Sequence, residues 1–363
     1  MSACQRSGGL ADEGSAARSV RRLSSTALAL ALACLLLLAL PALQPLASTR
    51  LTCGYDNAFH LWRALEAGVS LRQGVLYPRW APDMAQGFGY PLFSFQSPLS
   101  AQLAALLNLL GLAWPLALNA VFVLGMLAGA LSMFGLGEHL GGPLAGLVAG
   151  VAYLYAPFQA YDVFNRGSLS EGLAWAFPPL VLWALHRWVL EARRGWLALA
   201  ALGLAGFILT HQLFAFLFVP LWVGWVLVEA SLARDWRVAV RGALAGMLGL
   251  GLTAFFWLPG LAERGWVQTE RLLGTWVFDF RHNFLDLGQL LALPRVADPA
   301  LLNDWPPKAL GLLPALVALA PLARWRSLAR PLCWRSLLLA ACGGGFALLT
   351  LPITRPLWEL SLI

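Results

Sequence analysis

Three polar residues follow one of the most apolar runs of the chain, at a spacing that suits a helix. At about 100° per residue, Asp56, His60 and Arg63 fall on one narrow stripe. The opposite side of this helix carries the apolar residues Ala58, Leu61, Trp62 and Leu65. A carboxylate can take a proton as a general base, and a guanidinium can hold a phosphate through two parallel hydrogen bonds. The stripe is therefore a candidate site, and the apolar side a candidate membrane contact.

Other polar residues gather in the same segment and in one later segment. The first segment adds Glu66, Arg72, Arg79 and Asp83, and the later one contains Asp162, Asn165, Arg166 and Glu171. The apolar runs hold almost no ionisable groups in their middles. A charge at the bilayer centre costs at least about 2.5 kcal/mol, and ion-coupled transporters carry such charges because their pathway requires them. The distribution favours chemistry at one membrane surface over transport through the membrane.

The composition defines the broad class of protein. The chain is 59% hydrophobic and 12% charged, against about 25% charged residues in typical soluble domains. A bilayer core needs about 20 helical residues to cross, and a backbone in lipid must satisfy its own hydrogen bonds. We therefore predict an all-α polytopic transmembrane helix bundle with about nine crossings. The predicted spans are residues 24–47, 116–136, 140–158, 172–185, 196–211, 212–232, 242–260, 309–323 and 336–352.

The N-terminal region and one internal run need separate interpretation. The run from Ser24 follows three arginines, as in a secretory signal peptide, but it is longer than the usual apolar part of about 7 to 15 residues. We interpret it as a retained span behind a disordered cytoplasmic tail, residues 1–23. The run of residues 196–232 is too long for one crossing, so Thr210, His211 and Gln212 are predicted to mark a tight turn.

The positions of the arginines predict the orientation. With a cytoplasmic N-terminus, the basic segments HRWVLEARR, ARDWRVAVR and ARWRSLARPLCWR also lie inside. The net charge of +7 then reflects topology, and no nucleic-acid partner is predicted. External loops are expected at about 49–115, 159–171 and 262–307. The apolar stretch from Ser97 to Leu112 must lie in the interface without crossing, since otherwise every later basic loop would face outward.

Several segments resemble a known family. They read DNAFHLWRALEAGVSLRQGVLYPRWAPDMAQGFGYPLFSFQSPLS, AYLYAPFQAYDVFNRGSLSEGLAWAFPPLVLWAL, LTHQLFAF and AFFWLPGLAER. Together they are similar to the bacterial membrane family called 6-pyruvoyl-tetrahydropterin synthase-related, although nothing in the chain resembles a pterin enzyme. That family is similar in layout to the GT-C glycosyltransferases. The resemblance covers residues 24 to about 360, and its most specific parts are the YPRW block and the block from Arg166 to Glu171.

The resemblance implies an activity and a set of site residues. GT-C enzymes pass a sugar from a polyprenyl-phosphate carrier to an extracytoplasmic acceptor, with an acidic residue in the first external loop. Asp56 matches that residue and is the expected catalytic base. Substrate binding is expected from His60, Arg63, Arg79, Asp162, Arg166 and Glu171. A divalent cation is a possible cofactor, yet the second acidic pair of oligosaccharyltransferases is absent from this sequence. A polyprenyl-phosphate-linked sugar and membrane lipids are the expected partners, in the bacterial plasma membrane.

Each of these residues also has a structural interpretation. Asp56 suits a helix N-cap, where its charge complements the helix dipole. His60 fits an interfacial anchor as well as a site, Arg63 fits a lipid-headgroup contact, and Arg166 with Glu171 fits a structural ion pair. A non-catalytic membrane protein, either a lipid-carrier flippase or a scaffold, is therefore the alternative function. Because family members continue past the position of Ile363, we also expect the chain to be a C-terminally truncated fragment.

Overall fold

Helices form nearly all of the regular structure. The computed structural model describes residues 9–268, 278–293 and 328–360, with scattered positions between these ranges. Within them, the one strand-like feature is an isolated antiparallel bridge between Ala81 and Tyr90. The predicted all-α class is thus confirmed for the described part of the chain.

Five helical segments are long and apolar enough to cross a bilayer. They are Ser25–Ala47 within α1 (Gly9–Leu43) and η1 (Gln44–Ala47), α5 (Trp114–Gly141), α8 (Leu169–Ala174) with α9 (Phe177–Glu191), α11 (Gln212–Leu217) with α12 (Val219–Ala233), and α18 (Arg330–Leu349). The number rises to seven if two bent pairs each count as one span. These pairs are α6 (Pro143–Leu154) with α7 (Pro157–Tyr161) and η2 (Asp162–Arg166), bent by 41°, and α13 (Arg237–Leu252) with α14 (Ala254–Ala262), bent by 70°. Such helices indicate a membrane protein.

Five of the nine predicted spans correspond to these five segments, and residues 140–158 and 242–260 correspond to the two bent pairs. Helix α1 begins at Gly9, so its first turns occupy part of the predicted tail. The run of residues 196–211 corresponds to α10 (Arg194–Thr210), a shorter apolar helix. The run of residues 309–323 lies mostly outside the described residues, so nine crossings remain a prediction. Helix α4 (Leu99–Leu109) has 11 residues, fewer than the roughly 20 needed to cross a bilayer.

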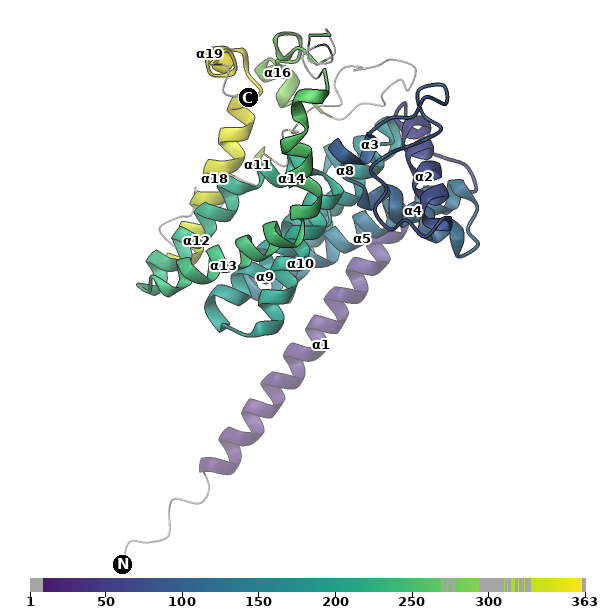
Figure 1. The fold of residues 1–363 in the computed structure, drawn as a ribbon. Coiled ribbons are helices and arrows are strands. Elements are labelled where there is room, and N and C mark those ends of the chain that lie inside the picture. Colours follow the sequence, from purple (N-terminus) through teal and green to yellow (C-terminus); the bar gives the residue numbers. More distant parts are fainter. Residues whose placement is uncertain are drawn as a thin grey trace, which may run out of the picture.

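The bundle has two main apolar cores. One is formed by α9, α10, α12 and α13, with Trp225 and Phe207 at its centre. The other is formed by α1, α5, α6 and α8, with Leu35, Phe122 and Met126 buried in it. Helices α5 and α9 pack against each other and join the two cores. Figure 1 shows α1 running along one side of the bundle and projecting beyond it toward the N-terminus.

Glycines allow α5 and α6 to approach closely. A Cβ on Gly146 would lie 2.8 Å from the carbonyl oxygen of Phe134, and one on Gly150 would lie 3.0 Å from that of Ala130. Small residues four apart on one helix face let membrane helices pack backbone to backbone. This packing holds the second core together next to α1.

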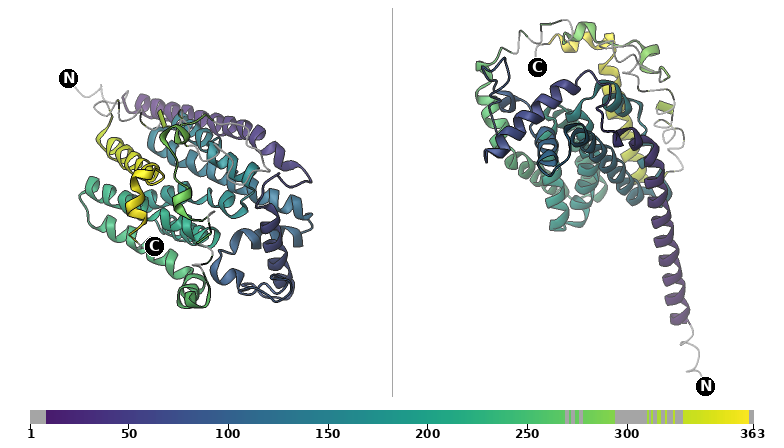
Figure 2. Two further views of the ribbon diagram at one scale, coloured as in Figure 1. Left: turned by 90° about the horizontal axis from the view of Figure 1, so that it is seen from above. Right: turned by 90° about the vertical axis from the view of Figure 1, so that its right-hand side faces the viewer.

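The helices that follow α1 form a cap at one end of the bundle. Helices α2 (Asn57–Arg72), α3 (Leu92–Phe95) and α4 gather where α1 ends (Figures 1 and 2). The polar stripe of α2 faces inward, because His60, Arg63 and Glu66 are buried. The aromatic side chains of Phe59 and Trp62 are exposed on the other side. Short helices elsewhere are η3 (Arg264–Trp266), η4 (Phe280–His282), α16 (Leu287–Leu290), η6 (Pro352–Thr354) and α19 (Arg355–Trp358).

A buried ion pair attaches α18 to the bundle. Arg335 donates two hydrogen bonds to Glu229 of α12, with Nε–Oε1 and Nη2–Oε2 distances of 2.7 and 2.9 Å. The Nδ1 atom of His186 on α9 lies 3.2 Å from the same Oε1 atom. Glu229 is 1% exposed, so the arginine supplies the charge that its burial requires. Polar contacts thus join α9, α12 and α18 near the end of the bundle opposite the cap.

Candidate functional site

The candidate site lies where the start of α2 meets the segment between η2 and α8. The backbone N–H of Asp56 donates to the carbonyl oxygen of Arg166 at 2.8 Å. Gly54 touches the backbone at Gly167 so closely that a Cβ on Gly54 would collide with it. Gly167 has a φ of +70°, a conformation that side-chain-bearing residues rarely adopt. Two glycines therefore bring together segments that are far apart in the sequence.

Arg166 is the centre of a cluster of charged side chains. Its Nε donates to Asp56 Oδ2 at 3.1 Å, and its Nη1 lies 2.6 Å from Glu171 Oε1 and 3.5 Å from Asp162 Oδ1. The structure thus gathers four of the predicted site residues into one network. No hydrogen bond from Nη2 of Arg166 is found among the described residues. We call Asp56, Asp162, Arg166 and Glu171 the charge cluster.

A single π-helical turn supplies two members of the charge cluster. The turn η2 begins at Asp162 and ends at Arg166, and π-helical turns are rare and frequent at functional sites. Asp162 is fully buried, and its Oδ2 accepts a hydrogen bond from the indole N–H of Trp175 at 3.0 Å. Asp162 therefore lies below the surface, where Arg166 and the indole of Trp175 hold its side chain in place.

Asp56 is the carboxylate of the cluster that an outside molecule can reach. Its side chain is 32% exposed, whereas those of Glu171 and Asp162 are 8% and 0% exposed. Burial raises the pKa of Asp56 above its usual value, and the neighbouring Arg166 partly opposes that rise. A raised pKa makes a carboxylate a better proton acceptor near neutral pH. Asp56 precedes α2 at the N-cap position, yet its side chain makes no capping hydrogen bond and turns to Arg166 instead.

His60 and Arg63 lie beneath the cluster and are 5% and 4% exposed. Arg63 donates to Ser170 Oγ at 3.0 Å and to the carbonyl oxygen of Ser97 at 2.8 Å, and its Nη1 is 3.4 Å from His60 Nδ1. Burial lowers the pKa of Arg63 to about 10. Burial and the charge of Arg63 hold the pKa of His60 well below its usual value, so His60 is neutral at pH 7. Neither residue is open to an outside molecule in this conformation.

Arg63 is a buried cation without a carboxylate partner among the described residues. Its Nε atom also makes no hydrogen bond there. An isolated buried charge is costly unless hydrogen bonds compensate it. Two of its partners are the neutral oxygens of Ser170 and Ser97, which indicates that Arg63 joins α2 to α8 and to the segment before α4.

Sequence reasoning did not include His211 and Gln212 in the site. His211 interrupts the apolar run as an extended residue, and its Nδ1 accepts the backbone N–H of Phe214 at 3.2 Å. The ring hydrogen therefore sits on Nε2, which lies 3.7 Å from Glu171 Oε1. Gln212 donates to the carbonyl oxygen of Phe95 at 2.6 Å and hydrogen-bonds to Ser97. The polar interruption Thr210-His211-Gln212 was the available signal, but the sequence suggested a turn.

Arg79 is not part of the charge cluster. It pairs with Glu263, which follows α14, and both side chains are 42% exposed. The neighbouring Tyr77 donates to the carbonyl oxygen of Phe93 at 2.8 Å. The YPRW block thus fastens the cap to the end of α14.

The described residues do not fit a divalent cation. They contain no group of three or more His, Cys, Asp or Glu side chains arranged to hold a metal ion. The carboxylates of the charge cluster converge on Arg166, whose guanidinium takes the place that a cation would need. We therefore assign no metal role to these residues.

No family model matches the chain, and no solved structure matches it. The chain is similar to an uncharacterized protein of Lactococcus lactis subsp. cremoris (strain MG1363), with 24% identity over 215 residues. That stretch covers 57% of this chain and 35% of the relative. The matched part thus spans about a third of the length of that relative.

Proposed function

We propose that the protein is a multi-pass protein of the bacterial plasma membrane with a cytoplasmic N-terminus and a GT-C-like layout. Its function is to transfer a sugar from a polyprenyl-phosphate donor to an extracytoplasmic acceptor. One observation carries the proposal: Asp56 is a partly exposed carboxylate of raised pKa, fixed beside an arginine directly after the first span. The apolar helices and the cap at one end of the bundle support the membrane setting.

The proposed chemistry assigns a step to each exposed group. Asp56 takes the proton of an acceptor hydroxyl, whose oxygen then forms a bond to the anomeric carbon of the sugar. The bond between that carbon and the phosphate oxygen breaks, and the phosphate leaves on its lipid carrier. The Nη2 atom of Arg166 is the guanidinium nitrogen without a described hydrogen bond, so it can donate to the departing phosphate. Asp162 and Glu171 hold Arg166 in place.

Asp56→Asn tests this function. Membranes containing the variant should transfer no sugar from a polyprenyl-phosphate donor, because an amide cannot accept the proton. Asp83→Asn is the matched control, since Asp83 is an exposed acid of the same segment outside the charge cluster. Full transfer by Asp56→Asn, with both variants inserted in the membrane, would remove the catalytic role.

The second candidate is a non-catalytic scaffold, and one observation favours it. Three acidic side chains surround Arg166, so the charge cluster is largely satisfied internally. Such an arrangement fastens the cap to the bundle without any substrate. Wild-type protein that transfers no sugar with any polyprenyl-phosphate donor would favour this candidate.

A further inference from the structure

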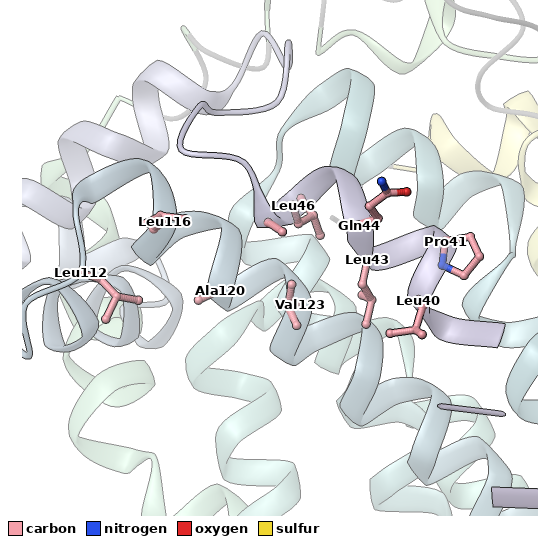
Figure 3. A pocket seen from close by; sticks show the side chains of 10 residues that line it. Leu40, Pro41, Leu43, Gln44, Leu46, Leu112, Leu116, Ala120 and Val123 are labelled. Atoms are coloured by element: carbon pink, nitrogen blue, oxygen red, sulfur yellow. The ribbon is translucent and has the colours of Figure 1, made fainter. Parts of the chain in front are cut away.

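An apolar groove lies between the end of α1 and the start of α5, and no residue of the charge cluster lines it. It has a volume of about 710 Å³. One wall comes from Leu40, Leu43 and Leu46, and the other from Leu116, Ala120 and Val123 (Figure 3). Gln44 is the polar side chain in its lining. Both walls belong to helices with the length and composition of membrane spans.

The chemistry of the walls selects the occupant. A buried water needs two to four polar partners, and this groove offers almost none. A hydrocarbon chain needs none, and it gains free energy from contact with every apolar wall residue. Because the walls are membrane-type helices, hydrocarbon chains are also what surrounds the groove. An acyl chain therefore fits the groove better than water or a polar solute.

The backbone of Arg50 is held next to the groove. Asn119, which precedes the wall residue Ala120, is 1% exposed. Its side-chain amide donates to the carbonyl oxygens of Ser48 and Arg50, at 3.0 and 2.8 Å. These two bonds hold the backbone of residues 48–50 against α5 at the level of the groove. Arg50 itself is exposed, and its guanidinium has no carboxylate within 4.0 Å among the described residues.

We propose that this groove binds one acyl chain of an anionic phospholipid, with the guanidinium of Arg50 on the headgroup phosphate. In this proposal the groove binds the acyl chain, and the positive charge of Arg50 pairs with the negative charge of the headgroup. A guanidinium at the membrane surface attracts anionic headgroups and meets phosphate through paired N–H groups. The site does not depend on the proposed sugar transfer, because none of its residues contacts the charge cluster.

Lipid retention on the full chain tests the site. The protein is reconstituted in nanodiscs of equal parts phosphatidylglycerol and phosphatidylethanolamine, extracted in mild detergent, and weighed by native mass spectrometry. We expect phosphatidylglycerol to be retained on wild type. Arg50→Gln should lower its retention about fivefold, the effect of one basic residue at an anionic lipid surface. Ala120→Phe, which fills the groove, should lower retention of both lipids.

Arg72→Gln is the matched control, because Arg72 is an exposed arginine at the far end of α2. Equal retention of phosphatidylglycerol by wild type and Arg50→Gln overturns the headgroup assignment. Unchanged retention in Ala120→Phe overturns the groove. If Ala120→Phe fails to insert, Leu116→Phe fills the same groove from one turn earlier. Displacement of phosphatidylglycerol by an equal amount of polyprenyl phosphate would also overturn the proposal, because the groove would then belong to a carrier lipid.

Discussion

Asp56 and Arg166 are joined twice, once through their backbones and once through their side chains. The N–H of Asp56 donates to the carbonyl oxygen of Arg166 at 2.8 Å, and Arg166 Nε donates to Asp56 Oδ2 at 3.1 Å. The backbone hydrogen bond holds the main chain of Asp56 in position, and the side-chain hydrogen bond orients its carboxylate. Both the backbone and the side chain of Asp56 are therefore attached to the π-helical turn that carries Arg166.

Arg166→Met should destabilise the protein strongly. It would leave the buried carboxylate of Asp162, and that of Glu171, without their shared cation, and breaking a buried pair costs about 3 to 5 kcal/mol. Arg79→Met is the matched control, because the exposed Arg79–Glu263 pair should contribute about 1 kcal/mol or less. Thermal unfolding in detergent measures both. Similar shifts of the melting temperature in the two variants would contradict the role of Arg166 as the partner of buried acidic side chains.

His60 should make the protein less stable in mild acid. Its pKa is lower in the folded protein than the usual 6.5, so the unfolded chain binds the proton more tightly. The free energy of unfolding therefore falls as the pH drops below about 6.5, by up to about 1.4 kcal/mol per pH unit from this group. His60→Gln should flatten the dependence of the melting temperature on pH between 7 and 5. A His60→Gln protein whose melting temperature depends on pH as strongly as that of wild type would refute the assignment.

Gly54→Ala should separate the two segments of the candidate site. The added methyl group would collide with the backbone at Gly167, and relieving such a clash costs about 1 to 3 kcal/mol. We expect a lower melting temperature and faster proteolysis at the start of α2. Gly265→Ala provides the control, since a Cβ there meets nothing within 4 Å. A Gly54→Ala protein as stable as wild type would mean that the close backbone contact does not form.

Arg335→Leu should loosen α18. It leaves Glu229 buried without its cation, which costs about 3 to 5 kcal/mol. The double variant Glu229→Leu with Arg335→Leu removes both charges, and we expect it to regain most of the lost stability. Hydrogen exchange of α18 amides measures the docking. Equal exchange in the single and double variants would contradict an ion pair that holds α18.

The sequence alone determined the class of fold and the register of the candidate helix. Long apolar runs require helices in a membrane setting, and the 3.6-residue period put His60 and Arg63 on one face of α2. These features depend on the spacing of apolar and polar residues along the chain, which can be read directly from the sequence. Sequence patterns also identified the residues of the charge cluster, but as members of two separate segments.

Only the tertiary structure decided which polar residues meet. Arg166 reaches Asp56 across 110 positions of the chain, whereas Arg79 turns to Glu263 across 184 positions and leaves the site. The structure also decided that the polar stripe of α2 faces inward, so that His60 and Arg63 are buried and Asp56 is accessible. Such partners follow from how α2, η2 and α8 pack and from two glycines that permit close contact. No local spacing encodes that packing, because side chains far apart in sequence meet only after the helices have assembled.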